Sequence, residues 1–211
     1  MSAYSVICQR AASIAALAAR KTVSGAQNSP MSVFTNPASG AAGQAAAYVT
    51  AIVDLLGAQD PMRVLAETPA GLRQAIDGVP AAKLKQREMP GKWSIAQVLR
   101  HLADSEVVWS WRMRLILAQD RPVITGYDQD QWADNLHYDE ADPAESLETF
   151  AILRRGNLRL VERASPEDLQ RVGVHAERGE ESVEHLRRLY AGHDLLHLQQ
   201  IARIRRAVSA G

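Results

Sequence analysis

Cysteine is almost absent from this sequence, which has Cys8 as its single cysteine among 211 residues. One cysteine cannot form a disulfide within the chain, and it cannot supply the several thiolates of a structural zinc site. Net charge is also missing, because 24 lysines and arginines balance 24 aspartates and glutamates. Nucleic-acid-binding proteins normally carry an excess of positive charge, so this balance argues against a DNA-binding function.

Long apolar runs are missing as well, since no stretch approaches the roughly 20 residues that span a bilayer. Hydrophobic residues nevertheless make up 46% of the chain, which is enough to bury a sizeable core. The length suits one domain of roughly 150 residues with an extension. We therefore expect a soluble cytoplasmic protein that binds neither membranes nor nucleic acid.

Acidic residues are absent before Asp54, while basic residues lie there among alanines and serines. This composition is typical of a transit peptide, and residues 11–19 could also form the core of a weak signal peptide. A third interpretation is a false start, because the stretch that begins at Met31 leads directly into the first helical pattern. We favour a false start or a disordered tail, and predict an N-terminal extension over residues 1–40 and one domain over residues 41–211.

Helical signals dominate the predicted domain. An apolar segment at 45–56 precedes the long helices, which are expected at 61–77, 94–119, 143–163 and 182–208. The second long helix has the clearest start, because Ser94 and Gln97 match a capping box. No segment shows the alternation of a strand, and 120–139 and 171–181 are expected to be loops. The predicted fold class is all-α, a four-helix bundle with a helical or disordered N-terminal extension.

Two histidines, His193 and His197, lie near the centre of the apolar face of the last predicted helix. Side chains four residues apart are neighbours on a helix, and two imidazoles at this spacing can chelate one metal ion. The glutamate of the H-E-x-x-H motif is missing, which excludes that class of zinc protease. Both could instead be core histidines bonded to polar neighbours. Burying two polar rings costs several kcal/mol unless they find partners, and a shared ion would satisfy both.

A metal site needs a third ligand, and His101 in the capped helix is the best candidate, although it lies at the edge of that helix's apolar stripe. The remaining histidines, His137, His175 and His185, are expected to be ordinary surface residues, although His137 and His175 lie in predicted loops and could instead be substrate-side groups. Glu106 lies on the apolar side of the same helix as His101. It could orient a ligand histidine from behind or form a buried ion pair with an arginine.

Three stretches carry a family signal: GKWSIAQVLRHLADSE (91–106), GYDQDQW (126–132) and AGHDLLHLQQI (191–201). In this order they resemble the signature of the DinB-like (YfiT-like) superfamily, and the resemblance spans about 60–208. It implies a four-helix bundle, often dimeric, with a divalent ion bound by one histidine from the second bundle helix and two from the fourth. By position, these ligands are His101, His193 and His197.

The resemblance also implies a range of activities. The superfamily includes S-transferases and isomerases that use low-molecular-weight thiols, members described only as metal-dependent hydrolases, and many proteins of no known activity. Three neutral imidazoles leave coordination positions open, as in catalytic metal sites. An ion there could lower the pKa of a bound water or a substrate thiol toward 7.

We therefore predict a metal-dependent enzyme, either a hydrolase or a low-molecular-weight-thiol S-transferase. Its divalent ion is expected to be zinc or nickel, its substrate a small molecule, and its assembly a homodimer. The alternative is a non-catalytic bundle protein that binds a metal or serves in a stress response. Tyr127, Asp128, Asp130 and Trp132 could wall the substrate pocket, or they could only pack the loop that contains them.

Overall fold

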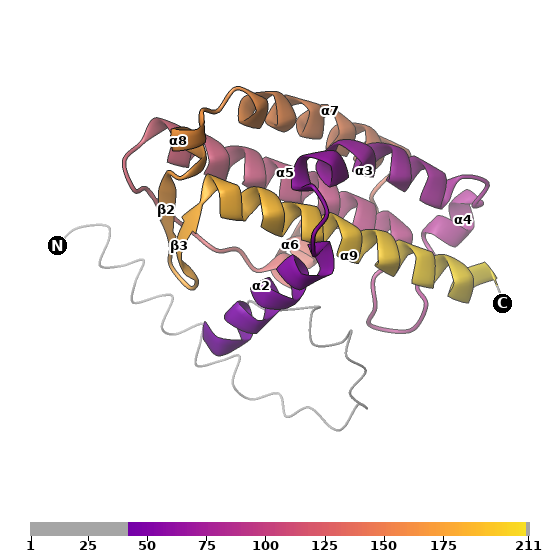
Figure 1. Cartoon of the computed structure of the whole chain (residues 1–211). Coiled ribbons are helices and arrows are strands. Elements are labelled where there is room, and N and C mark those ends of the chain that lie inside the picture. Colours follow the sequence, from indigo (N-terminus) through magenta and orange to yellow (C-terminus); the bar gives the residue numbers. More distant parts are fainter. Residues whose placement is uncertain (1–41, 210–211) are drawn as a thin grey trace, which may run out of the picture. The chain divides into compact units, whose positions relative to one another are not determined.

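The computed structural model describes residues 42–209, with side chains from residue 47 onward. The predicted extension over residues 1–40 lies outside the described residues. Four long helices form a bundle (Figure 1): α3 (Pro61–Ile76), α5 (Ile95–Ala118), α7 (Pro143–Glu162) and α9 (Val183–Ser209). Both α3 and α5 pack against α7 and against α9, so the order around the bundle is α3, α7, α5, α9. The predicted four-helix bundle is confirmed, and each helix agrees with its predicted range to within one residue at either end.

Side-chain caps explain where the long helices begin. The Ser94 hydroxyl accepts a hydrogen bond from the N–H of Gln97 at 3.3 Å, and the Gln97 side chain accepts one from the N–H of Ser94 at 3.0 Å. Asp60 and Asp142 cap α3 and α7 in the same position, and a proline follows each of them. These side chains satisfy N–H groups that the first turn of a helix leaves without partners.

The bundle has two apolar clusters with a polar layer between them. One cluster includes Trp109, Met113, Leu186 and Tyr190, and the other includes Leu72, Leu99, Leu102, Phe150 and Ile201. Along α9, the buried members of the first cluster end at Ala191 and those of the second begin at Ile201. The residues between these two positions include His193, Asp194 and His197. The polar side chains of the bundle interior therefore gather at its middle.

Strands are present in the described part of the chain, which corrects the prediction that there are none. Strand β1 (Val123–Ile124) pairs in parallel with β2 (Val172–His175), which pairs antiparallel with β3 (Gly179–Ser182). Two to four residues are too few to show alternation. The remaining short helices are α4 (Ala81–Leu84), α6 (Gln129–Asn135) and α8 (Pro166–Leu169).

Helix α2 (Ala42–Leu56) packs against α9 beside the bundle, as Figure 1 shows. The two backbones meet at Gly192, where a Cβ atom would overlap the carbonyl oxygen of Ile52 and lie 2.7 Å from its Cγ2 atom. Real Cβ atoms do not approach other atoms this closely. Only glycine therefore lets α2 lie on α9 next to His193.

We expect Gly192→Ala to lower the free energy of unfolding by about 1–3 kcal/mol, because the added methyl group forces a backbone shift in a packed interior. Chemical denaturation would measure the change. Gly156→Ala is the matched control, since Gly156 lies inside α7 with no atom within 4 Å of the added Cβ. That control should gain about 0.5–1 kcal/mol, because alanine is the better helix former. Equal effects of the two substitutions would contradict the close approach of α2 to α9.

In the part of the chain that the structure describes, none of the helices combines the length and the hydropathy needed to cross a membrane.

Candidate functional site

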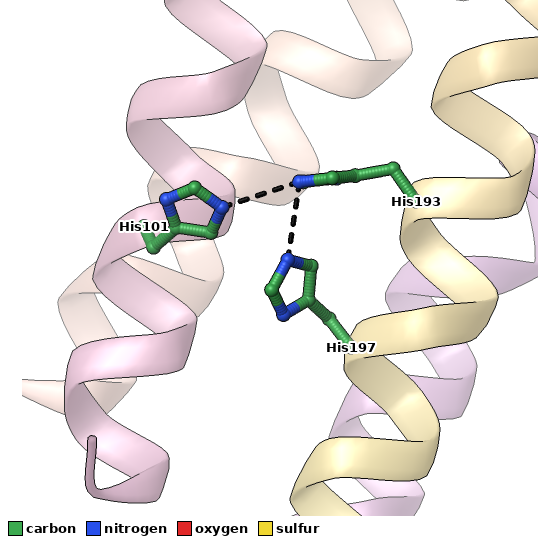
Figure 2. A group of neighbouring side chains, drawn as sticks. All are labelled: His101, His193 and His197. Atoms are coloured by element: carbon green, nitrogen blue, oxygen red, sulfur yellow. Dashed lines mark hydrogen bonds between the residues drawn. The ribbon is translucent and has the colours of Figure 1, made fainter. Parts of the chain in front are cut away.

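Three imidazole rings converge at the middle of the bundle. His101 extends from α5 toward His193 and His197, which extend from successive turns of α9 (Figure 2). The Nε2 atom of His193 lies 3.2 Å from Nε2 of His101 and 3.1 Å from Nε2 of His197. One ring nitrogen from each residue lies within 4.8 Å of the others, as the ligands of a single metal ion would. His101, at the edge of the apolar stripe of α5, therefore faces α9.

All three rings are neutral at pH 7. Burial lowers the pKa of His197 to about 4. Burial also holds the pKa values of His101 and His193 well below the usual range, and the charge that His197 would carry lowers them further. A neutral imidazole has one unprotonated nitrogen, and that lone pair is what a divalent ion requires.

Hydrogen bonds and ring contacts orient the three rings. The Nδ1–H group of His197 donates to the Gln200 side-chain oxygen at 2.7 Å, which leaves Nε2 of the same ring with its lone pair toward the centre. The Trp93 ring packs on His101 with 5.1 Å between ring centroids. Nδ1 of His193 is buried without a hydrogen-bond partner. The His193 ring packs edge-on against the His197 ring, with 4.3 Å between centroids.

Protons alone do not satisfy the three converging nitrogens. A neutral imidazole has a single N–H group, which lies in the ring plane and can donate to one partner. Nε2 of His193, however, faces a ring nitrogen of both other histidines. A metal ion accepts a lone pair from each ring. Three nitrogens at about 2.0–2.1 Å from one ion lie about 3.0–3.4 Å from one another, which matches the two short distances at His193. The residues therefore fit a divalent metal ion.

A network of buried charges lies behind the histidines. The Arg154 guanidinium donates to both carboxylate oxygens of Asp194, at 2.5 and 3.1 Å, and to Glu106 at 2.7 Å. Asn157 donates to the other Glu106 oxygen at 2.9 Å, and all four side chains are about 1% exposed. Of the two roles considered for Glu106, the structure shows the buried ion pair with an arginine. Asp194 follows His193 directly, so Arg154 ties the histidine-bearing turn of α9 to α5 and α7.

Arg154 and Asn157 are not among the residues predicted from the sequence, although a signal for them was present. The inward-facing residues of α7 recur every three or four positions: Leu147, Phe150, Arg154, Asn157 and Val161. An arginine and an asparagine at core positions of an otherwise apolar stripe indicate a buried polar network, because such groups are rarely buried without partners.

A cavity of about 110 Å³ adjoins the histidines, and His193 is part of its wall. Helix α2 contributes Tyr48, and α5 contributes Ser105 and Arg112. Tyr127 also lines the cavity, and its hydroxyl lies 3.4 Å from the Ser105 hydroxyl. One of the predicted pocket residues therefore does face this space.

The other residues proposed for the pocket wall have different positions. Trp132 packs against the Tyr127 ring with 4.5 Å between centroids, and so supports the wall from behind. Asp128 caps α6 by accepting from the N–H groups of Asp130 and Gln131. Neither aspartate is among the residues that line the cavity.

His175 is buried, which corrects the prediction that it is a surface residue. It ends β2 and is 1% exposed. Burial, followed by the charges of Arg178 and Arg112, lowers its pKa to about 4. The expected loop over residues 171–181 does not occur, because His175 ends a strand of the sheet. His137 is exposed and His185 is partly exposed, as predicted.

The metal-free protein should lose stability as the pH falls from about 6.5 to about 4. Buried histidines with lowered pKa values stay neutral in the folded chain and take up protons on unfolding, so low pH favours the unfolded state. Each such group contributes up to about 1.4 kcal/mol per pH unit. The free energy of unfolding, measured by denaturant titration at several pH values in this range, should fall less steeply with pH in His175→Gln than in the wild type. An unchanged pH dependence in His175→Gln would contradict the buried neutral state of His175.

Comparisons with known proteins agree with the fold. The protein named "Putative metal-dependent hydrolase YfiT" of Bacillus subtilis is 30% identical over 146 residues, which are 69% of this chain and 82% of that protein. A protein with the same kind of name from Oceanobacillus iheyensis is 32% identical over 136 residues, 64% of this chain and 78% of its own. The solved structure of YfiT from Bacillus subtilis, described as a four-helix bundle of unusual topology, matches with a TM-score of 0.65 and 28% identity. That match covers 69% of this chain and 84% of the YfiT chain.

A model of the DinB superfamily matches residues 65–201, and this range includes all three converging histidines. Because the match covers more than half of the sequence, the chain belongs to the DinB superfamily.

Proposed function

We propose that the chain is a metal-dependent enzyme that acts on a small molecule, and that His101, His193 and His197 hold its divalent ion, zinc or nickel. The observation that carries this proposal is the position of His193. Its ring nitrogen faces the other two histidines, and the same residue forms part of the wall of the cavity. A ligand in the cavity would therefore lie next to the ion.

The proposed chemistry is hydrolysis or transfer of a low-molecular-weight thiol. A divalent ion on three imidazoles lowers the pKa of water or of a thiol, and so supplies a nucleophile near neutral pH. The names of the relatives support hydrolysis. The sequence resemblance supports thiol transfer.

Hydroxyl groups beside the histidines could orient the substrate. Burial raises the pKa of Tyr127, so its phenol stays protonated at neutral pH and can donate a hydrogen bond. The Ser105 hydroxyl lies 3.5 Å from Nε2 of His101 and 3.4 Å from the Tyr127 hydroxyl. The two hydroxyls therefore connect the histidine cluster to the cavity wall.

Metal analysis of untagged protein, followed by two parallel activity screens, would test this proposal. One screen would use small ester and amide substrates, and the other an electrophile such as monochlorobimane with added thiols. We expect zinc- or nickel-dependent turnover in one screen and its loss in His193→Ala. Stoichiometric metal without turnover in either screen would favour the alternative, a bundle that only binds or senses an ion. The cavity beside His193 favours the enzyme, because a storage site needs no space for a substrate.

The assembly is proposed to be a homodimer. Two large apolar side chains are exposed one turn apart on α5: Val107 is 48% exposed and Trp111 is 62% exposed. Light scattering should give the mass of a dimer for the full chain and that of a monomer for Trp111→Glu, since a carboxylate in an apolar interface is strongly unfavourable. A monomeric wild type, or a variant that remains dimeric, would contradict this use of α5.

A further inference from the structure

Arg112 is a buried arginine in the wall of the cavity. It lies on α5, and only 5% of its surface is exposed. Its Nη2 atom donates to the carbonyl oxygen of Thr125 at 3.0 Å, and also lies 3.5 Å from Nε2 of His175. Its Nε–H group is buried and has no hydrogen-bond partner. Arg112 thus has an unused donor inside the protein.

The Glu181 carboxylate interacts with the charge of Arg112 from a distance, but its ion-pair partner is Arg178. Among the described residues, no carboxylate lies within ion-pair distance of Arg112. Arg154 shows the contrast, because that buried arginine is paired with two carboxylates. Arg178 also lines the cavity, but the Arg178 guanidinium donates two hydrogen bonds to Glu181, at 2.7 and 2.8 Å.

His175 does not serve as an acceptor for Arg112 either. The backbone N–H of Glu177 donates to Nδ1 of His175 at 3.2 Å. In a neutral imidazole the proton then resides on Nε2, the atom that faces Arg112. Two donors therefore face each other at this position, and both could serve an anion.

A guanidinium remains charged at every physiological pH, and a buried charge without a counter-ion is strongly unfavourable. We propose that Arg112 binds a carboxylate group of the substrate, which places a small carboxylic acid in the cavity beside the histidines. This proposal rests on the proposed function, because it assigns the substrate class of the same site. The planar fork of an arginine matches the two oxygens of a carboxylate.

A carboxylate fits this cavity better than a phosphate does. A phosphate monoester carries a charge of about −1.5 to −2 at pH 7, which one guanidinium does not balance. Among the described residues of the cavity wall, Arg112 is the one arginine without a carboxylate partner. Glu177 also lines the cavity and adds a negative charge that would oppose a second one on the ligand.

Calorimetry on the zinc-loaded full chain would test the proposal with three probes, of which the second and third each differ from the first by one group. They are 3-mercaptopropionate, 3-mercaptopropan-1-ol and propionate. We expect 3-mercaptopropionate to bind about tenfold or more tightly than the alcohol, which is the effect of a charge-assisted hydrogen bond. Arg112→Gln should remove this preference. Arg114→Gln is the matched control, because Arg114 is exposed on the same helix and does not line the cavity, and it should keep the preference.

The outcomes separate this proposal from the proposed function. If the alcohol binds as tightly as the acid, or if Arg112→Gln keeps the preference, the carboxylate site is wrong even though a thiol reaches the metal. If propionate binds in a manner that depends on Arg112 and the thiol adds nothing, the carboxylate site stands and thiol transfer is wrong. If Arg112→Gln does not fold, Arg112→Lys provides a second variant. It keeps the positive charge but loses the two-pronged guanidinium, and should bind the acid with intermediate affinity.

Discussion

Replacing His193 by alanine should lower the affinity for zinc or nickel by at least about 100-fold. His193 is the middle residue of the cluster, with Nε2 atoms of the other two histidines at 3.2 and 3.1 Å. The loss of a group that only supports a ligand typically costs 10–100-fold in metal affinity, and the loss of a ligand itself should exceed that. His101→Ala and His197→Ala should behave in the same way. Competition titration against a metal-sensitive dye would measure all three affinities.

The fold should survive these three substitutions. The apolar clusters on either side of the histidines do not depend on an ion, and alanine is a good helix former. His185→Ala is the matched control, because His185 is on the same helix, two turns before His193, and is not part of the cluster. The metal affinity of this variant should equal that of the wild type. If any one of the three variants binds metal as tightly as the wild type, that residue is not a ligand.

Replacing Arg154 by methionine should lower the free energy of unfolding by about 3–5 kcal/mol, the usual result of removing one partner from a buried ion pair. The substitution leaves the Glu106 and Asp194 carboxylates buried without a cation. It also removes a hydrogen bond to the carbonyl oxygen of Leu65 at 2.9 Å. Arg155→Met is the matched control, because Arg155 is exposed on the same helix, and it should change stability by less than about 0.5 kcal/mol.

The pH dependence of the Arg154→Met variant would identify the cause of its instability. Two carboxylates without a cation in the interior have raised pKa values in the folded state, so folding takes up protons and low pH favours the folded variant. The stability deficit measured by denaturant titration should therefore be smaller at pH 5 than at pH 8. The further substitutions Glu106→Gln and Asp194→Asn should restore part of the lost stability at pH 8. A deficit that does not depend on pH would indicate lost packing and not lost charge compensation.

The sequence predicted the long helices well because their signals are local. The capping box at Ser94 and the aspartate–proline starts at Asp60 and Asp142 lie within four residues of the boundaries they set. The sheet could not be found in this way. Strand β1 pairs with β2 about fifty positions further along the chain, and neither is long enough to show alternation.

The histidines of the candidate site were predictable, and the cavity was not. Spacing on one helix face identified His193 and His197, the need for a third ligand pointed to His101, and the family motifs agreed with all three. The cavity wall combines α2, α5, the segment before α6, the β2–β3 turn and α9, so its composition depends on how these elements pack. Arg112 lies among the buried residues of α5 with Trp109, Met113 and Ile116, where a charged residue is itself a signal of function.

X-ray absorption spectroscopy of the zinc- or nickel-loaded protein tests the central claim most directly, because it reports the ligands of the bound ion. The account predicts one ion per chain with three imidazole nitrogens at about 2.0–2.2 Å, and fewer imidazoles in each histidine-to-alanine variant. A spectrum that shows two or fewer imidazoles in the wild type, or that is unchanged in His101→Ala, would contradict the three-histidine metal site.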